Sequence, residues 1–212
     1  MTPRRRFPRV GVLGGSFDPV HVGHLILAET AIDHLRLDEL ILVPARKPAH
    51  KRRRRLAPVA DRIAMLRLAV RGNPRLTISR IEADRPGVAF TVRTLEVLTA
   101  RRPAEWFFLM GEDSLREFGS WREPARILEM ARLAVVPRPD RGRRKGIAGP
   151  AGLRTALRRR VVTVPMPPVG ISASEIRARI RRGASVRYWM PDAVLTYLNR
   201  HGLYRNARTG RT

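Results

Sequence analysis

The sequence predicts an α/β fold of the Rossmann-like, doubly wound kind, with a mainly parallel sheet and helices on both faces. Short, wholly apolar runs alternate along the chain with longer segments in which apolar residues recur at helical spacing. The first apolar run leads directly into a glycine pair and then a helix. Strands that alternate with helices imply parallel pairing through crossover connections, and sites in such folds lie beyond the carboxyl ends of the strands.

The elements follow in order from these patterns. The first strand is expected at residues 10–13, and the helix after it carries Leu25, Ala28, Ile32 and Leu35 at helical spacing. Later strands are expected at 40–43, 76–81, 106–110, 133–136 and 161–164. Later helices are expected at 60–70, 92–100, 124–130, 172–182 and 191–201, the last with proline in its first turn and glycine as its stop. Residues 137–150 are rich in Pro, Gly and Arg without periodicity, which predicts a mobile surface loop.

The composition predicts one domain with a full core, because the chain has 212 residues and is 43% hydrophobic. We expect a basic extension at 1–9, the domain at 10–204 and a tail at 205–212. No apolar run approaches the length of a membrane span, and the basic N-terminus lacks the apolar region of a secretory signal. The absence of cysteine excludes disulfides and cysteine-ligated metals. A cytoplasmic protein without a membrane partner is the expectation, and homo-oligomer formation stays open.

The formal net charge of +25 raises the question of nucleic acid, because Lys and Arg side chains release counterions when they meet a phosphate backbone. Only three of the 43 basic residues are lysines, and the rest are arginines spread along the chain. Such a skew is equally typical of a genome-wide codon bias. We therefore expect nonspecific polyanion binding in low salt and no specific nucleic-acid partner.

The most informative segment follows the first strand and has the sequence Gly14-Gly15-Ser16-Phe17-Asp18-Pro19-Val20-His21-Val22-Gly23-His24. The glycines are expected in a tight strand-to-helix turn, where backbone N–H groups and the helix dipole favour an anion. His21 and His24 stand three residues apart, so both side chains can face a polyphosphate at the helix start. The segment therefore predicts a phosphate site.

A second motif, Gly170-Ile171-Ser172-Ala173-Ser174-Glu175-Ile176-Arg177, begins a later helix. Ser172 and Glu175 have the spacing of a capping box, which would explain the serine as a helix start and nothing more. Capping is compatible with phosphate binding, because other N–H groups of the first turn stay available to a ligand. The chain has no Gly-x-Gly-x-x-Gly and no Walker A lysine. It therefore lacks the loops that define dinucleotide-bound dehydrogenases and P-loop NTPases.

Both motifs resemble those of the HxGH nucleotidyltransferases. The first fits the pattern Gly-x-Phe-x-Pro-x-His-x-Gly-His, and the second is similar to Ile-Ser-Ser-Thr-x-Ile-Arg, with Ser174 in place of threonine. The resemblance implies that the second helix start and Arg177 hold nucleotide phosphates. It runs from about Val10 to Tyr204, and the segment 197–204 resembles the closing helix of the family.

Within this superfamily, the remaining motifs resemble those of bacterial nicotinate mononucleotide adenylyltransferases. Gly111-Glu112-Asp113-Ser114 is similar to the Gly-x-Asp-Ser stretch, whose carboxylate can accept hydrogen bonds from ribose hydroxyls. The resemblance implies that Trp121 stacks on the pyridine ring; the alternative is a core aromatic. Phe90-Thr91 replaces the usual Tyr-Thr, which removes a phenolic hydrogen bond. His50 and Lys51 resemble the His-Lys of a phosphate-contacting loop, or belong to a solvated basic loop.

The resemblance implies adenylyl transfer from ATP to nicotinate mononucleotide, which gives nicotinate adenine dinucleotide and pyrophosphate. The implied catalytic residues are His21, His24 and Arg177. The implied ATP-binding residues are Gly14, Gly15, Ser16, Phe17, His21, His24, Gly111, Asp113, Ile171, Ser172, Ser174 and Arg177. The implied mononucleotide-binding residues are Ser16, His50, Lys51, Phe90, Thr91 and Trp121.

Magnesium is expected with ATP, held through the phosphates rather than by a dedicated protein site. Asp18 is the nearest carboxylate, and a turn hydrogen bond competes with metal contact as its role. Two other readings stay open. One is a relative that acts on nicotinamide mononucleotide or phosphopantetheine or transfers cytidylyl groups, and the other is a noncatalytic basic binding protein.

Overall fold

The computed structural model describes residues 7–47, 56–137 and 154–205. A sheet of six parallel strands has the order β3-β2-β1-β4-β5-β6, which confirms the predicted fold class. The strands are β1 Arg9–Gly15, β2 Glu39–Pro44, β3 Leu76–Ile78, β4 Glu105–Gly111, β5 Arg132–Val136 and β6 Val161–Thr163. The helices are α1 Val22–Leu35, α2 Val59–Val70, α3 Thr91–Arg101, α4 Glu112–Arg116, η2 Phe118–Ser120, α5 Pro124–Met130, α6 Arg154–Arg160, α7 Ala173–Arg181 and α8 Asp192–Arg200.

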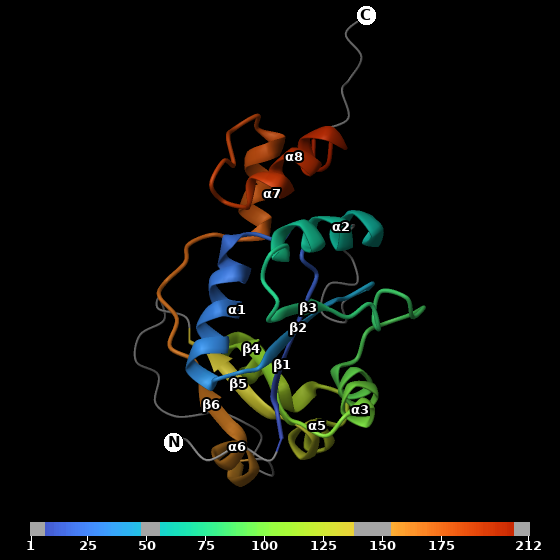
Figure 1. The fold of residues 1–212 in the computed structure, drawn as a ribbon, viewed down its shortest axis with the longest axis vertical. Helices are drawn as coiled ribbons and strands as arrows, with labels where there is room; N and C mark the ends of the chain where they lie inside the picture. The colour runs from blue at the N-terminus through green and yellow to red at the C-terminus, as the bar shows by residue number, and fades with distance from the viewer. Residues whose placement is uncertain (1–6, 48–55, 138–153, 206–212) are drawn as a thin grey trace, which may run out of the picture.

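The central strands are buried on both faces, because successive side chains of a strand point to opposite sides. Leu13 of β1 and Leu109 of β4 belong to the core that includes α1, α2, α7 and α8. Val12 and Phe108, one residue away in each strand, belong to the core with α3, α5 and α6. In Figure 1, α7 and α8 lie above α2 and the start of α1, while α3 and α5 lie at the lower right.

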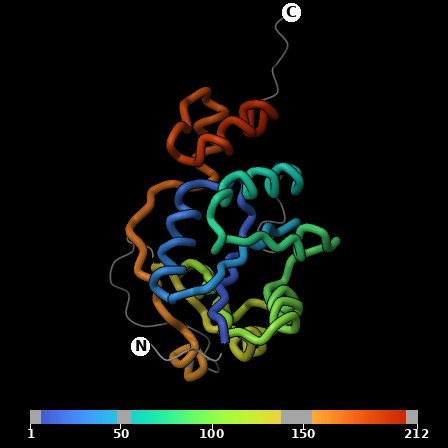
Figure 2. Tube along the Cα trace, viewed as in Figure 1, coloured from blue at the N-terminus to red at the C-terminus, as the bar shows by residue number. Residues whose placement is uncertain are grey.

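The strand order reverses beside β1. From β1 the chain adds β2 and β3 on one side, then returns to add β4, β5 and β6 on the other. Such a switch point opens a crevice at the carboxyl ends of the two central strands. The trace in Figure 2 shows the last two helices, α7 and α8, next to the start of α1 and to α2. The backbone N–H of Val22 donates to the carbonyl of Trp189 (2.9 Å), so this C-terminal segment contacts the start of α1.

Several predicted boundaries were wrong. β1 starts at Arg9 rather than residue 10, because the Arg9 N–H donates to Asp38 and its side chain pairs with Glu105. β3 ends at Ile78 rather than residue 81, because its partner β2 ends at Pro44, which has no N–H to continue the ladder. The predicted loop 137–150 lies outside the described residues except for Pro137.

Three short helices were not predicted. α4 and η2 have five and three residues, too few for a helical period to show in the sequence. α6 contains an arginine run, and Leu157 is its one fully buried apolar side chain. Within the described ranges, no helix is both long and apolar enough to cross a bilayer.

Candidate active site

The first motif lies at the carboxyl end of β1, beside the switch point of the sheet. Gly14 and Gly15 still pair with Val43 and Pro44 of β2. The prediction that both glycines form the turn was therefore wrong, because the strand continues through them and the turn begins at Ser16. The two glycines nevertheless line a cavity at this edge of the sheet.

Phe17 connects the glycine end of β1 to the histidine pair. Its φ of 45° lies in the left-handed region, and its side chain is only 1% exposed. A Cβ on Gly15 would lie 3.1 Å from the Phe17 ring, so a larger residue at position 15 would displace a buried ring. The same ring makes an edge contact with His24, with 5.1 Å between ring centroids. Phe17 thus packs the turn against the start of α1.

His21 and His24 lie together at the first turn of α1. The backbone N–H of His21 donates to Nδ1 of His24 (3.2 Å), and the two ring centroids are 3.8 Å apart. Because Nδ1 of His24 accepts this hydrogen bond, a neutral His24 carries its proton on Nε2. His24 is thereby fixed as a hydrogen-bond donor through Nε2.

His21 is the N-cap residue of α1, and its side chain is only 6% exposed. Burial lowers the pKa of His21 to about 4, because desolvation disfavours the imidazolium form. At neutral pH the ring is therefore neutral in the protein without ligand. It can offer one N–H donor to a phosphate.

This burial predicts a stability that depends on pH. Because the folded-state pKa of His21 lies below its ordinary value of 6.5, its contribution is fully present above pH 6.5 and is lost as pH falls towards 4. We expect His21 to account for up to about 3 kcal/mol of the decrease in unfolding free energy over this range. Urea unfolding at several pH values, compared between the natural protein and His21→Asn, measures it. Equal pH slopes for the two proteins would contradict the assignment.

Asp18 is the centre of a buried hydrogen-bond cluster. Its Oδ1 accepts from the Ala57 N–H (3.0 Å) and from the Tyr204 hydroxyl (2.8 Å), while Nη1 of Arg177 donates to its carbonyl and to Oδ2 (3.4 Å). Burial, with the Asp18 charge next, raises the pKa of Tyr204, which therefore stays a protonated donor. Both oxygens of the Asp18 carboxylate thus hold segments of the chain together. Among the described residues, no group of three His, Asp or Glu side chains could hold a metal ion.

The second motif lies next to the first. Ser172 is the N-cap of α7, and its Oγ accepts from the Glu175 N–H (3.2 Å), as a capping residue does. Just before this cap, Val169 approaches α1, where a Cβ on Gly23 would lie 3.4 Å from its side chain. Arg177, on α7, is buried and reaches Asp18 in the turn of the first motif. Residues more than 150 positions apart in the sequence therefore meet at the start of α1.

A cavity of about 380 Å³ opens from the glycine end of β1 towards α3 and α4. Seven predicted site residues line it: Gly14, Gly15, Ser16, Phe90, Thr91, Asp113 and Trp121. The cavity also has residues that the sequence did not predict, namely Glu82, Thr94, Ser114, Glu117 and Arg122 among others. The cavity therefore brings together residues predicted for both ligands.

Trp121 packs against core residues and also lines the cavity. Its ring packs at 6.0 Å from Phe108 and 5.6 Å from Phe118, measured between centroids, and the residue lines the cavity. Phe90 lies on the same cavity, with the Arg122 guanidinium 5.2 Å from its ring centroid. A flat ligand ring in this cavity would meet aromatic walls.

The other predicted residues do not line this cavity. Phe17, His21, His24, Ile171, Ser172, Ser174 and Arg177 lie around the start of α1 and α7, and Gly111 ends β4 as the N-cap of α4. His50 and Lys51 lie outside the described residues.

Sequence reasoning missed Arg62, a fully buried arginine of α2. Its guanidinium donates to the carbonyls of Ser16 (2.6 Å), Ala45 (2.8 Å) and Ala57 (3.0 Å), which joins the turn after β1 to the end of β2. A signal was available, because Arg62 stands beside Ile63 and three and four residues before Met65 and Leu66, on the inward side of the helix. A charged residue on such a stripe indicates a buried polar role.

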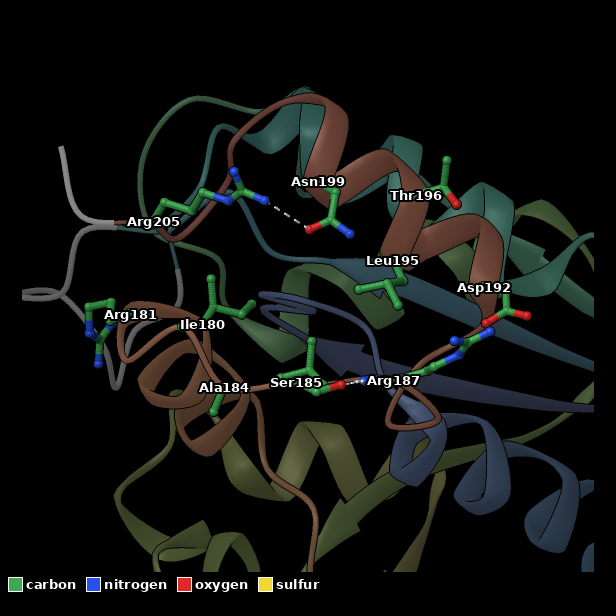
Figure 3. Close-up of a pocket in the computed structure, with 12 residues that line it drawn as sticks. Ile180, Arg181, Ala184, Ser185, Arg187, Asp192, Leu195, Thr196, Asn199 and Arg205 are labelled. Carbon is green, nitrogen blue, oxygen red and sulfur yellow. Dashed lines mark hydrogen bonds between the residues drawn. The ribbon is translucent and has the colours of Figure 1, made fainter. Parts of the chain in front are cut away.

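A separate cavity of about 680 Å³ lies between α7 and α8 (Figure 3). None of the predicted site residues line it. Two of its polar side chains bond within the chain: Asn199 accepts from Arg205 (3.4 Å), and Ser185 accepts from the Arg187 N–H (3.2 Å). The candidate site is therefore the crevice at β1, not this groove.

Comparison with known proteins places this geometry in a family. The family model described as cytidylyltransferase-like matches residues 12–179. A protein of Thermomicrobium roseum named "Probable nicotinate-nucleotide adenylyltransferase" is 45% identical over 198 residues, which cover 93% of this chain and 92% of that protein. A protein of the same name from Thermus thermophilus is 43% identical, over 93% of this chain and 100% of the relative.

Solved structures share the fold at low identity. The nicotinic acid mononucleotide adenylyltransferase of Plasmodium falciparum, complexed with NaAD, superposes with a TM-score of 0.73 at 15% identity and covers 93% of this chain and 97% of its own. A structure from Vibrio parahaemolyticus titled "Putative Nicotinate-nucleotide Adenylyltransferase" gives a TM-score of 0.65 at 18% identity, over 94% and 97% of the two chains. These structures support the same Rossmann-like architecture.

Proposed function

The chain belongs to the nicotinate-nucleotide adenylyltransferases of the cytidylyltransferase-like family, and from this premise we propose how its residues carry out the reaction. The enzyme is a nucleotidyltransferase that joins the AMP part of ATP to nicotinate mononucleotide. The products are nicotinate adenine dinucleotide and pyrophosphate. One observation carries the proposal: Gly14, Gly15 and Ser16 of the first motif line the same cavity as Phe90 and Trp121.

The reaction needs positioning more than a nucleophilic side chain. A phosphate oxygen of the mononucleotide attacks the α-phosphorus of ATP, the new P–O bond forms, and the bond to the β-phosphate breaks to release pyrophosphate. No covalent intermediate with the protein is required. Charge grows on the transferring group and on the leaving pyrophosphate, so fixed hydrogen-bond donors lower the barrier.

We assign the α- and β-phosphates to the histidine pair. The hydrogen bond from the His21 N–H to Nδ1 of His24 supports this, because it leaves Nε2–H of His24 as a donor of fixed tautomer. Phe17 supports the orientation of the same ring through its edge contact. His21, kept neutral by burial, would gain a proton more readily once a polyphosphate lies beside it.

We assign the leaving pyrophosphate to Ser172, Ser174 and Arg177. The Ser172 and Ser174 hydroxyls lie 3.5 Å apart at the start of α7. Arg177 uses Nη1 to hold Asp18, and its other guanidinium N–H groups are those we assign to phosphate oxygens. By this contact Arg177 also links its own position to that of the turn Ser16–Pro19.

Enzymes of this class use a divalent cation with ATP, and we propose Mg²⁺. The phosphates and water would supply most of its ligands, as is usual for magnesium. The carboxylate of Asp18 is occupied by three donors, which favours its structural role over metal contact. The cation would neutralise charge on the triphosphate.

We assign the mononucleotide to the 380 Å³ cavity, with its pyridine ring against Trp121 and Phe90. Ser16 and Thr91 would offer polar contacts from the turn and from the start of α3. Gly14 and Gly15 favour close approach of a ligand to the backbone, and Asp113 is assigned to a ribose hydroxyl of ATP. His50 and Lys51 are proposed as further phosphate contacts.

The first test of this function is a product assay. Purified protein is incubated with Mg-ATP and either nicotinate or nicotinamide mononucleotide, and the products are separated by chromatography. We expect dinucleotide from the nicotinate form at much higher kcat/KM. Product mainly from nicotinamide mononucleotide would leave the proposed mechanism in place and change the assigned substrate. If ATP binds but no dinucleotide forms from either mononucleotide, the enzyme uses another acceptor.

A further inference from the structure

Glu82 is a half-buried carboxyl group on the wall of the cavity assigned to the mononucleotide. Its Oε1 accepts a hydrogen bond from the Thr94 hydroxyl (2.6 Å), and Thr94 is only 4% exposed on the first turns of α3. Within the described residues, this hydroxyl is the hydrogen-bond partner of Glu82, and no ion pair compensates its charge. Burial therefore raises the pKa of Glu82, and the Thr94 hydrogen bond only partly opposes this effect.

Other charged groups lie near the same cavity. Arg85 and Arg93 line a narrow cleft behind Glu82, and Asp113, Glu117 and Arg122 line the main cavity with it. None of them perturbs Glu82 as strongly as burial and the Thr94 hydroxyl do. The environment of Glu82 thus favours its neutral form more than water does, on the wall of the cavity that we assign to the pyridine ring.

The two charge states suit different ring substituents. A neutral carboxyl group donates one hydrogen bond, which a carboxylate on the ring accepts. An ionised carboxyl group only accepts, which suits the N–H groups of a carboxamide, and it repels a carboxylate. The nicotinate ring carries a carboxylate where the nicotinamide ring carries a carboxamide, so the charge of Glu82 can discriminate between the two rings.

We propose that Glu82 is a specificity-determining residue of this site: when neutral it favours the carboxylate-bearing mononucleotide, and when ionised it favours the carboxamide. The inference rests on the proposed function, because it needs the pyridine ring to lie in the cavity of Trp121. It adds a residue outside the sequence motifs to the recognition of the substrate. It also makes the choice of substrate depend on pH.

The test is the ratio of kcat/KM for nicotinate mononucleotide to kcat/KM for nicotinamide mononucleotide, measured over the whole pH range in which thermal unfolding shows the protein to be folded. The ratio cancels titrations that both substrates share, such as those of their phosphates. We expect the ratio for the natural protein to fall roughly tenfold as Glu82 ionises. In Glu82→Gln, which keeps the shape but cannot ionise, the ratio should stay flat.

The matched control is Glu129→Gln, which removes an exposed carboxylate from α5 and should keep the natural pH curve. A flat ratio in the natural protein, or the same curve in Glu82→Gln, overturns this inference while dinucleotide synthesis still supports the function. Dinucleotide from neither substrate overturns the proposed function and this inference with it.

A second variant tests the mechanism if Glu82→Gln folds poorly. Thr94→Val removes the hydroxyl that stabilises the ionised form of Glu82, so the pKa of Glu82 should rise further. The fall in the substrate ratio should therefore move to higher pH. A purely structural role of this pair would change both substrates alike and leave the position of the transition unchanged, which would overturn the inference.

Discussion

Replacing His24 by alanine is expected to lower kcat for dinucleotide synthesis by about 100- to 1,000-fold, the usual cost of one fixed donor to a developing charge. The reason is local. His24 accepts from the His21 N–H through Nδ1, so its remaining N–H is held as a donor in one orientation. Steady-state kinetics with both substrates saturating gives kcat, and thermal unfolding checks that the variant is folded.

The matched control for this variant is His34→Ala, which removes an exposed histidine from the other end of α1. We expect it to keep kcat within about twofold, since surface substitutions away from special features have small effects. Lys51→Ala should lose far less than His24→Ala, because an ammonium group supplies a point charge rather than a hydrogen-bond donor of fixed direction. Similar, modest losses for His24→Ala and Lys51→Ala would contradict the role of His24.

Replacing Arg62 by methionine is expected to lower the free energy of unfolding by about 1–3 kcal/mol, the usual cost of leaving buried hydrogen-bonding groups without a partner. Three backbone carbonyls, of Ser16, Ala45 and Ala57, would lose their donors in a site that water does not reach freely. The loss should also loosen the turn after β1, since Ser16 belongs to it. Urea unfolding measures the stability.

Arg67→Met provides the control, because Arg67 is an exposed arginine of the same helix. It should change the unfolding free energy by no more than about 0.5 kcal/mol. If both variants lost the same small amount, the hydrogen bonds of Arg62 would not be holding the turn.

Much of the fold could be predicted because local patterns decide it. Continuous apolar runs such as 10–13 and 106–110 are typical of strands that are buried on both faces of a parallel sheet. Their alternation with helices indicates the fold class. Short elements could not be predicted in the same way. α4 and η2 follow the end of β4, where their tight turns pack Leu115 and Phe118 into the core.

The membership of the family was also readable from the sequence, and the comparisons confirm it. The roles of the individual site residues stay predictions, which the variants above test. For Arg177 the structure adds a contact that no motif contains: its guanidinium holds Asp18, a residue 159 positions earlier.

The strand that ends at Gly15 and the helix that begins after His21 could be read from the sequence alone, because apolar runs and helical spacing are patterns of residues close in the chain. Only the tertiary structure decided that Arg62 would hold the turn and that Glu82 would face the cavity. Both placements depend on contacts between distant segments. Burial strengthens the hydrogen bonds of Arg62 and disfavours the charge of Glu82, and it arises only when those segments pack together.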